Sequence, residues 1–133
     1  MLVAAQQRMT QLVDLELASD GVDSNGYAML SLIGVRGPVR LTEIASELGM
    51  PLTTASDVMR RLESRNHVRR RPNPEDGRSF LFELTARGDR EWRRGWGALQ
   101  RINAGLLSQI NEQETRDALE GLNRAFEAAL TDD

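Results

Sequence analysis

Apolar residues recur with helical spacing along most of the chain, most regularly in a central stretch that begins near residue 41. Two short apolar stripes follow each other there across a Gly-Met turn at residues 49 and 50. The stripes are formed by Leu41, Ile44, Ala45 and Leu48, and by Ala55, Val58, Met59 and Leu62. The i, i+3, i+4, i+7 spacing predicts two short helices, each with one side against a core.

The ends of these two helices also have sequence signals. Thr42 is the expected N-cap of the first helix, Gly49 is its expected stop, and the second helix is expected to open at Pro51. The small residues Ala45 and Ala55 stand where two crossed helices must approach closely. The pair therefore predicts a helix-turn-helix.

The polar side of the second helix carries hydroxyl, carboxylate and guanidinium groups. At 100° per residue, this side contains Thr53, Asp57, Arg60 and Ser64, with Thr54 and Arg61 flanking them. Donors near the start of a helix that enters a DNA groove can reach base edges, and those further along can reach phosphates. An ordinary solvated helix face has the same pattern, so this face by itself does not decide between the two interpretations.

Residues 68–84 predict a β-hairpin. The segment Pro-Asn-Pro-Glu-Asp-Gly at 72–77 is rich in turn-forming residues, and an apolar run with Phe and Leu follows at 79–84. Arg78 is expected near the hairpin tip, where a guanidinium can enter a narrow minor groove. Asp76 could hold that guanidinium in a bidentate pair, although a surface turn with an ordinary Asp-Arg pair is the alternative.

These motifs together resemble the MarR family of bacterial transcriptional regulators. The resemblance rests on Leu41-Thr42-Glu43-Ile44-Ala45, Leu48-Gly49, Arg61-Leu62-Glu63, Asp76-Gly77-Arg78-Ser79 and Leu84-Thr85-Ala86-Arg87-Gly88. It implies a homodimeric winged-helix protein that binds a palindromic double-stranded DNA operator and often releases it when a small-molecule effector binds. The residues expected to contact DNA are Thr42, Thr53, Thr54, Ser56, Asp57, Arg60, Arg61, Arg70, Asp76 and Arg78.

Four positions depart from the family pattern. Asp57 and Leu52 stand where basic or polar residues are usual, and Asn66-His67 replaces the usual Gly-Leu after the second helix. Asp57 could accept a hydrogen bond from cytosine, or could pair with Arg60 or Arg61 and orient them. Asn66 tolerates the left-handed conformation that the turn needs.

The rest of the chain predicts a mainly α fold around this small β-hairpin. We expect a single domain over residues 1–133, in which a winged helix-turn-helix lobe at 24–85 is flanked by dimerisation helices at 1–22 and 86–133. Apolar residues at both chain ends, such as Leu2 to Leu17 and Leu119 to Leu130, suggest a shared dimer interface. Packing of the N-terminal helix within its own chain would explain that helix equally well.

Signals at the ends of the flanking elements place the other boundaries. Asp23 or Ser24 is expected to cap a helix at about 25–35, and residues 39–41 to add a short strand beside the hairpin. Thr85 is expected to cap a long helix that reaches about Gln109. Asn111 opens a capping-box-like start to a final helix that reaches about Leu130.

Charge and composition limit the classes of function that this protein could have. The net charge is −3, but residues 60–94 hold 11 Arg against 6 acidic residues, which is typical of one DNA-facing surface on an acidic body. The absence of Cys excludes disulfides and Cys-ligated zinc. No signal peptide, long apolar run, nucleophile motif, phosphate loop or metal-spaced cluster is present, so we expect a cytoplasmic protein that is not an enzyme, needs no cofactor and has no membrane partner. His67 is expected in a turn or strand.

Two questions stay open at this level. A small-molecule cleft could involve Met9, Tyr27, Met29 and Trp92, although core packing explains each of them singly. A winged-helix protein-interaction module is the rival function, and it would predict an apolar exposed helix face and no basic focus.

Overall fold

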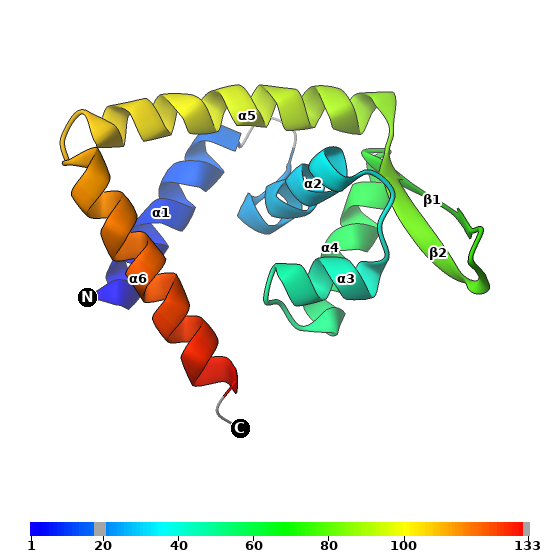
Figure 1. The fold of residues 1–133 in the computed structure, drawn as a ribbon. Coiled ribbons are helices and arrows are strands. Elements are labelled where there is room, and N and C mark those ends of the chain that lie inside the picture. Colours follow the sequence, from blue (N-terminus) through cyan, green and yellow to red (C-terminus); the bar gives the residue numbers. More distant parts are fainter. Residues whose placement is uncertain (18–20, 132–133) are drawn as a thin grey trace. The chain divides into compact units, whose positions relative to one another are not determined.

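The computed structural model describes residues 1–17 and 21–131. In this part of the chain it contains six helices and one two-stranded antiparallel sheet, so the predicted mainly α fold with a β-hairpin is confirmed (Figure 1). The elements are α1 (Leu2–Leu17), α2 (Ser24–Arg36), α3 (Leu41–Glu47), α4 (Leu52–Ser64), β1 (Val68–Asn73), β2 (Asp76–Leu84), α5 (Ala86–Leu107) and α6 (Glu112–Thr131). The chain up to Leu99 forms one compact unit, and the chain from Gln100 onward forms a second.

Three of the helix starts use the caps that the sequence predicts. Asp23 accepts a hydrogen bond from the Gly26 N–H at 2.8 Å, which caps α2. Thr85 caps α5 by accepting from the Gly88 N–H at 3.0 Å. Asn111 caps α6 by accepting from the Glu114 N–H at 3.2 Å.

The predicted N-cap at Thr42 is wrong, because α3 begins two residues earlier than that cap requires. Its N-cap is Arg40, whose backbone N–H donates to Glu43 Oε2 at 3.0 Å. The Arg40 side chain donates to the other Glu43 oxygen at 3.2 Å, and these hydrogen bonds hold the pKa of the Glu43 carboxyl below its ordinary value. Thr42 is therefore an exposed residue of the first helical turn.

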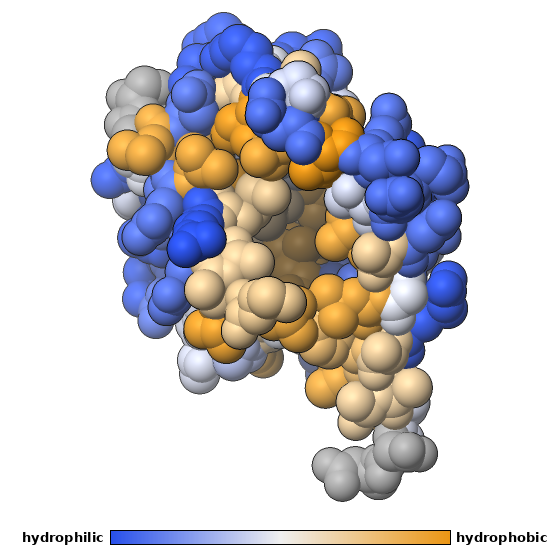
Figure 2. Space-filling view, turned by 90° about the vertical axis from the view of Figure 1, so that its left-hand side faces the viewer, coloured by the Kyte–Doolittle hydropathy of each residue, from blue (hydrophilic) through white to orange (hydrophobic). Residues whose placement is uncertain are grey.

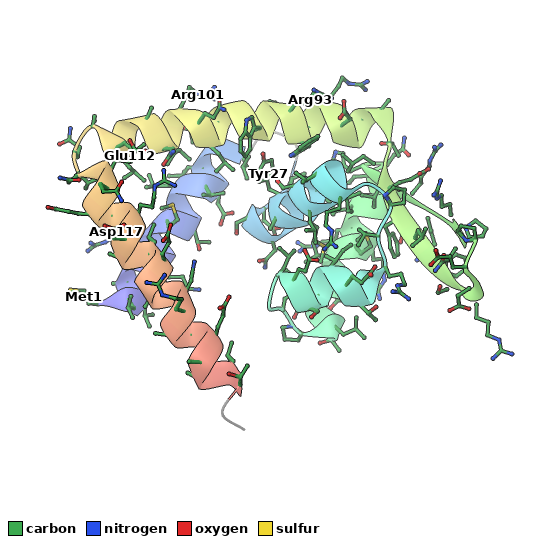
Figure 3. The ribbon with its side chains drawn as sticks, in the orientation of Figure 1. Met1, Tyr27, Arg93, Arg101, Glu112 and Asp117 are labelled. Atoms are coloured by element: carbon green, nitrogen blue, oxygen red, sulfur yellow. The ribbon has the colours of Figure 1, made fainter. Side chains whose placement is uncertain are left out.

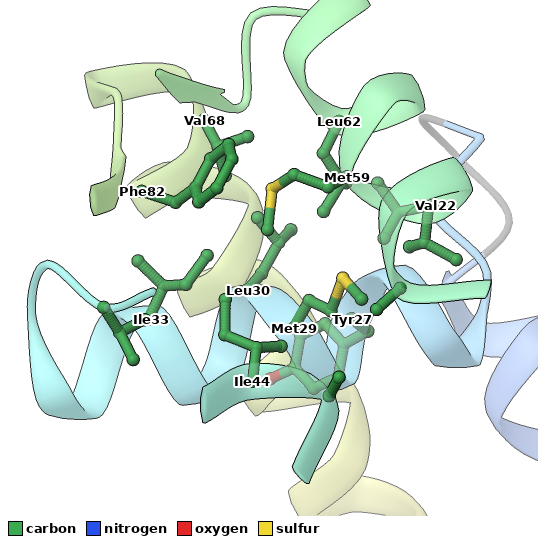
Figure 4. Close-up of a cluster of buried hydrophobic side chains, with 14 of the residues drawn as sticks. Val22, Tyr27, Met29, Leu30, Ile33, Ile44, Met59, Leu62, Val68 and Phe82 are labelled. Atoms are coloured by element: carbon green, nitrogen blue, oxygen red, sulfur yellow. The ribbon is translucent and has the colours of Figure 1, made fainter. Parts of the chain in front are cut away.

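A single apolar core holds α2, α3, α4 and the hairpin together (Figure 4). Met29, Leu30 and Ile33 enter it from α2, and the predicted stripes of α3 and α4 meet them there. The hairpin contributes Val68 and Phe82. The inward side chains of the hairpin thus fix it against the helices as part of the folded lobe.

The short strand expected at 39–41 is reduced to one β-bridge. Val39 and Phe82 exchange two backbone hydrogen bonds, of 3.1 and 2.9 Å. The pairing ends there because α3 already begins at Leu41.

Helices α2 and α5 approach each other closely at two glycines. A Cβ atom at Gly95 would lie 2.1 Å from the ring of Tyr27, and one at Gly34 would lie 2.6 Å from the ring of Trp92. The Tyr27 hydroxyl donates to the Trp92 carbonyl at 3.2 Å, and Figure 3 labels Tyr27 between the two helices. Burial raises the pKa of the Tyr27 hydroxyl.

The terminal helices expose much of their apolar surface. In α1, Leu17 is buried, but most of the other apolar side chains are open to solvent, and no residue of α6 is buried. Figure 2 shows uncovered hydrophobic surface on the side of the molecule that it presents. None of the described helices is both long enough and apolar enough to cross a membrane.

Candidate nucleic-acid interface

The turn between α3 and α4 has the geometry that the sequence predicts. Gly49 has a left-handed φ of 61°, and the following Met50 N–H donates to the Ala45 carbonyl at 3.0 Å. Pro51 precedes α4 as its N-cap residue, so the helix starts at Leu52, one residue later than expected. Ala45 and Ala55 are buried where the two helices cross, as a helix-turn-helix requires.

Helix α4 separates its apolar and polar residues cleanly. Ala55, Val58, Met59 and Leu62 are all buried. The opposite side exposes Thr53, Asp57, Arg60, Arg61 and Ser64, whereas Thr54 and Ser56 are half-buried at its edges. The side that was predicted to face DNA is therefore open to solvent.

The charged residues of this face are paired within the protein. Arg60 donates to Asp57 at 3.1 Å, which is one of the pairings predicted for that carboxylate. Arg61 donates to Asp23 at 3.2 Å, at the N-terminus of α2. Both pairs are exposed and therefore weak, so DNA phosphates can compete for the arginines.

The hairpin tip is built by Asn73 and Asp76, which face each other across the two-residue turn at 74–75. The Asn73 side chain accepts from the Glu75 N–H at 3.1 Å and donates to the Ser79 hydroxyl at 3.0 Å. The register shifts between Pro72, opposite Phe80, and Asn73, opposite Asp76. Residues 77–79 therefore have no partner opposite them on β1.

Arg78 lies in this irregular segment of β2. The Asp76 carboxylate accepts from the backbone N–H of Arg78 at 3.1 Å, so Asp76 shapes the turn. The expected bidentate pair between Asp76 and the Arg78 guanidinium is wrong. Among the residues that the structure describes, none binds that guanidinium, which leaves its charge and its five donors free.

The three arginines of β1 are held by carboxylates. Arg69 donates to Glu83 at 2.7 Å, and Arg71 lies 3.6 Å from the other oxygen of Glu83. Arg70 donates twice to Glu63 of α4, at 2.6 and 2.9 Å, and these hydrogen bonds raise the pKa of Arg70. The bidentate pair ties the hairpin to α4.

Aromatic rings complete the surroundings of Arg70. Its guanidinium carbon lies 5.6 Å from the ring centroids of both Phe80 and Phe82. Arg70 was predicted to contact DNA, but the structure engages its guanidinium with Glu63 and these rings. Sequence reasoning missed the role of Glu63, because the residue follows Leu62 by one position and its partner is seven residues away across a turn.

The turn after α4 depends on Asn66 and His67. Asn66 has a left-handed φ of 59°, as expected, and His67 is fully buried. The His67 N–H donates to the Leu62 carbonyl at 2.9 Å, and its carbonyl accepts from the Thr85 N–H at 3.0 Å. A Cβ at Gly88 would lie 1.9 Å from that same His67 carbonyl oxygen. This turn therefore locks the end of α4 against the start of α5.

A second feature of the first unit is an apolar groove of about 410 Å³ between α2 and α5. It is lined by Ser31, Val35, Trp92, Arg93 and Trp96. Of the four residues predicted for a ligand cleft, Trp92 lies here, Met29 and Tyr27 are buried, and Met9 is an exposed residue of α1. The apolar helical spacing of Trp92 and Trp96 was visible in the sequence, but Ser31 and Val35 carried no signal for such a groove.

Comparison with known proteins relates this chain to a protein family. The MarR family model matches residues 24–80. The uncharacterized HTH-type transcriptional regulator YfiV of Bacillus subtilis (strain 168) is 30% identical over 105 residues, which cover 76% of this chain and 65% of YfiV. The HTH-type transcriptional repressor MdtR of the same organism is 26% identical over 117 residues, covering 88% of this chain and 76% of MdtR. This chain therefore spans less than two thirds of the length of YfiV.

A solved structure shows that the similarity extends over nearly the whole chain. A probable transcriptional regulator from Pseudomonas aeruginosa has a TM-score of 0.80 and 29% sequence identity. The match covers 94% of this chain and 92% of that one. The match therefore includes the terminal helices in addition to the central lobe.

Proposed function

This chain belongs to the MarR family of transcriptional regulators, and we propose that it is a DNA-binding repressor that recognises a palindromic operator as a homodimer. The observation that carries the proposal is the guanidinium of Arg78 on the hairpin, which no described residue binds, together with an exposed polar face on α4. The two elements share one core, so they can present base-reading and backbone-contacting groups together.

The roles on DNA follow from position and chemistry. Thr53, Thr54, Ser56 and Asp57 lie in the first half of α4, the half that reads base edges in a helix-turn-helix. Arg60 and Arg61 lie further along and reach phosphates, for which they exchange their exposed carboxylate partners. Arg78 enters the adjacent minor groove.

A homodimer is supported by the terminal helices. Leu119, Phe126 and Leu130 share one side of α6 and are between 50% and 82% exposed in the single chain. Apolar stripes that a chain leaves uncovered at both of its ends need a partner, and a second copy supplies two such surfaces with two-fold symmetry. Two copies would then read half-sites about 10 base pairs apart.

The groove beside Trp92 is the site that we propose for an effector. Its volume of about 410 Å³ suits a small molecule, and its two indole rings with one guanidinium suit an aromatic or apolar ligand that carries an acceptor. The Trp92 carbonyl also accepts the hydrogen bond from the Tyr27 hydroxyl. A ligand in the groove would therefore alter the contact between α2 and α5. Quenching of tryptophan fluorescence, followed by release of bound DNA, is the measurement for this part of the proposal.

The rival function, a winged-helix module that binds another protein, has less support. It requires an apolar exposed face on α4, and that face is polar apart from Leu52. It also gives no reason for a guanidinium without a partner at the hairpin tip.

The experiment that tests the proposal is selection of bound fragments from a pool of random double-stranded DNA by the intact protein. We expect enrichment of an inverted repeat, with an affinity at least a thousandfold above that for unrelated DNA. Enrichment of no sequence, or equal affinity for every duplex at physiological salt, would contradict the proposed function.

A further inference from the structure

We infer that Leu52 is a specificity-determining residue that contacts the 5-methyl group of a thymine in each operator half-site. The inference rests on the proposed function, because it concerns the same face of α4. It begins from an apolar side chain that the fold leaves half exposed at the start of the recognition helix.

The exposure of Leu52 separates it from the other apolar residues of α4. Its side chain is 51% exposed, whereas each of the other large apolar side chains among the described residues of this helix is at most 3% exposed. At about 100° per residue, Leu52 lies at the border between the buried stripe, which includes Ala55 and Met59, and the polar side that begins at Ser56. Leu52 therefore leaves about half of its apolar side chain open to solvent at the start of the recognition helix.

The backbone fixes where this side chain can reach. Pro51 immediately precedes Leu52 and has a locked φ, and the Pro51 carbonyl accepts from the Ala55 N–H at 3.0 Å. Leu52 is thus the first residue of a regular helix, with two side-chain torsions to vary. The first turn of a recognition helix is the part that lies deepest among the base edges.

The chemistry of the major groove offers one match for an isobutyl group. Each base pair presents hydrogen-bond donors and acceptors there, and the apolar group on an unmodified edge is the thymine methyl. A leucine placed against cytosine, adenine or guanine would desolvate a donor or acceptor without replacing its hydrogen bond, which is unfavourable. Leu52 thereby favours thymine and disfavours the other bases at one position.

Thr53 is the neighbouring residue that could produce a similar effect, since it also carries a methyl group and is exposed. Replacing Thr53 with Ser removes that methyl and keeps the hydroxyl. The variants Leu52→Ala and Thr53→Ser therefore show which of the two side chains produces the preference for thymine.

The experiment replaces each thymine of the selected operator in turn with deoxyuridine, which lacks the methyl and keeps every hydrogen-bonding group. For the unmodified protein, we expect one thymine per half-site at which this change weakens binding about fourfold, and more than tenfold when both half-sites are changed. Leu52→Ala should bind the thymine and uracil operators equally, at about the affinity of the unmodified protein for the uracil operator. Thr53→Ser should keep the thymine preference.

Three results would overturn the inference. They are tolerance of every uracil substitution within twofold by the unmodified protein, an unchanged thymine preference in Leu52→Ala, or loss of the preference in Thr53→Ser instead. Thermal unfolding of Leu52→Ala should match that of the unmodified protein, because the removed side chain is half exposed. If the intact protein selects no DNA sequence at all, the proposed function fails as well, so the two failures are distinguishable.

Discussion

Arg78 is the hairpin arginine that no described carboxylate binds. Arg69, Arg70 and Arg71 lie on the neighbouring strand and have carboxylate partners within 4 Å. The positive charge concentrated in residues 60–94 is therefore partly neutralised locally. A guanidinium without a partner costs the fold nothing to remove, and in a narrow minor groove it contributes to affinity.

We predict that Arg78→Ala weakens operator binding about tenfold and lowers the slope of log affinity against log salt by about two, because a dimer loses two charge contacts. The melting temperature should stay nearly constant. Arg78→Lys should recover part of the affinity, because the ammonium keeps the charge but loses the planar fork. Fluorescence anisotropy titrations at several salt concentrations measure both quantities.

Arg69→Ala is the matched control for this change. It alters the net charge equally on the same hairpin, but it removes a guanidinium that Glu83 binds at 2.7 Å. We expect a smaller loss of affinity. Equal losses in the two variants, or an unchanged salt slope in Arg78→Ala, would mean that the hairpin tip does not enter the groove.

Asp57 permits a second prediction at the scale of one residue. Because its carboxylate binds Arg60 at 3.1 Å, we expect Asp57→Ala to leave the selected operator sequence unchanged and to tighten binding to unrelated DNA severalfold. The change releases a cation and removes a group that repels phosphates. Selection with the variant, followed by titration of specific and unrelated duplexes, is the measurement. A new preferred base at one position per half-site would show instead that Asp57 reads cytosine.

The pair of Glu63 and Arg70 couples two elements, α4 and the hairpin. Glu63 is largely shielded by the fold, with 22% of its side chain exposed, and it binds both edges of the Arg70 guanidinium. The pair therefore fixes the hairpin relative to α4. We expect it to affect DNA binding through this geometry and not through a charge contact of its own.

We predict that Glu63→Gln and Arg70→Met each weaken operator binding about threefold to tenfold without changing its salt slope. In a double-mutant cycle on unfolding free energy, the coupling between the two should be about 0.5–1 kcal/mol, because the pair is partly exposed. A salt slope lowered by about two in Arg70→Met alone would place Arg70 on a phosphate, as the sequence predicted. Denaturant unfolding and binding titrations provide the two readouts.

Helix α5 offers two glycines with opposite surroundings. Gly95 faces the Tyr27 ring of α2, whereas a Cβ at Gly105 would meet no atom within 4 Å. We predict that Gly95→Ala destabilises the protein by about 1–3 kcal/mol through overpacking. Gly105→Ala should stabilise the helix by up to about 1 kcal/mol, because alanine has the higher helix propensity.

Thermal and denaturant unfolding of the two variants side by side measures this difference. A second copy packed tightly against Gly105 would make Gly105→Ala destabilising, and its dependence on protein concentration would reveal that contact. A stabilising Gly95→Ala would contradict the packing of Tyr27 against α5.

At the scale of the whole molecule, the proposed homodimer depends on the terminal helices. Helix α6 has no buried residue, and its apolar side chains lie on one face. A monomer would contact one half-site, so loss of the dimer should remove most of the operator affinity. We therefore expect the same surface to serve both assembly and operator binding.

We predict that Phe126→Glu yields a monomer at micromolar concentration and weakens operator binding at least tenfold, because a carboxylate cannot be buried in an apolar interface without large cost. Ala128→Glu is the matched control, since it adds the same charge on the opposite side of α6 and should leave the dimer intact. Sedimentation velocity measures the assembly state. A folded monomer for the unmodified protein, or a dimer for Phe126→Glu, would contradict this interface.

Much of the structure was predictable because its signals are local. Apolar periodicity gave the helices of the central motif, and short-range chemistry gave the caps at Asp23, Thr85 and Asn111 and the left-handed turns at Gly49 and Asn66. The N-cap at Thr42 was misplaced because Arg40, which has no usual capping side chain, is held through Glu43.

The sequence by itself determined the helix-turn-helix, the hairpin and the exposed polar face of α4, since each follows from the spacing of residues within about four positions or from a compact turn. Tertiary structure decided which charges stay free. The pairing of Arg70 with Glu63 and of Arg61 with Asp23 depends on how separate elements pack, and the freedom of Arg78 depends on a register shift at the hairpin tip. Spacing along a chain sets the side of an element on which a residue lies, but the packing of other elements sets what that residue meets.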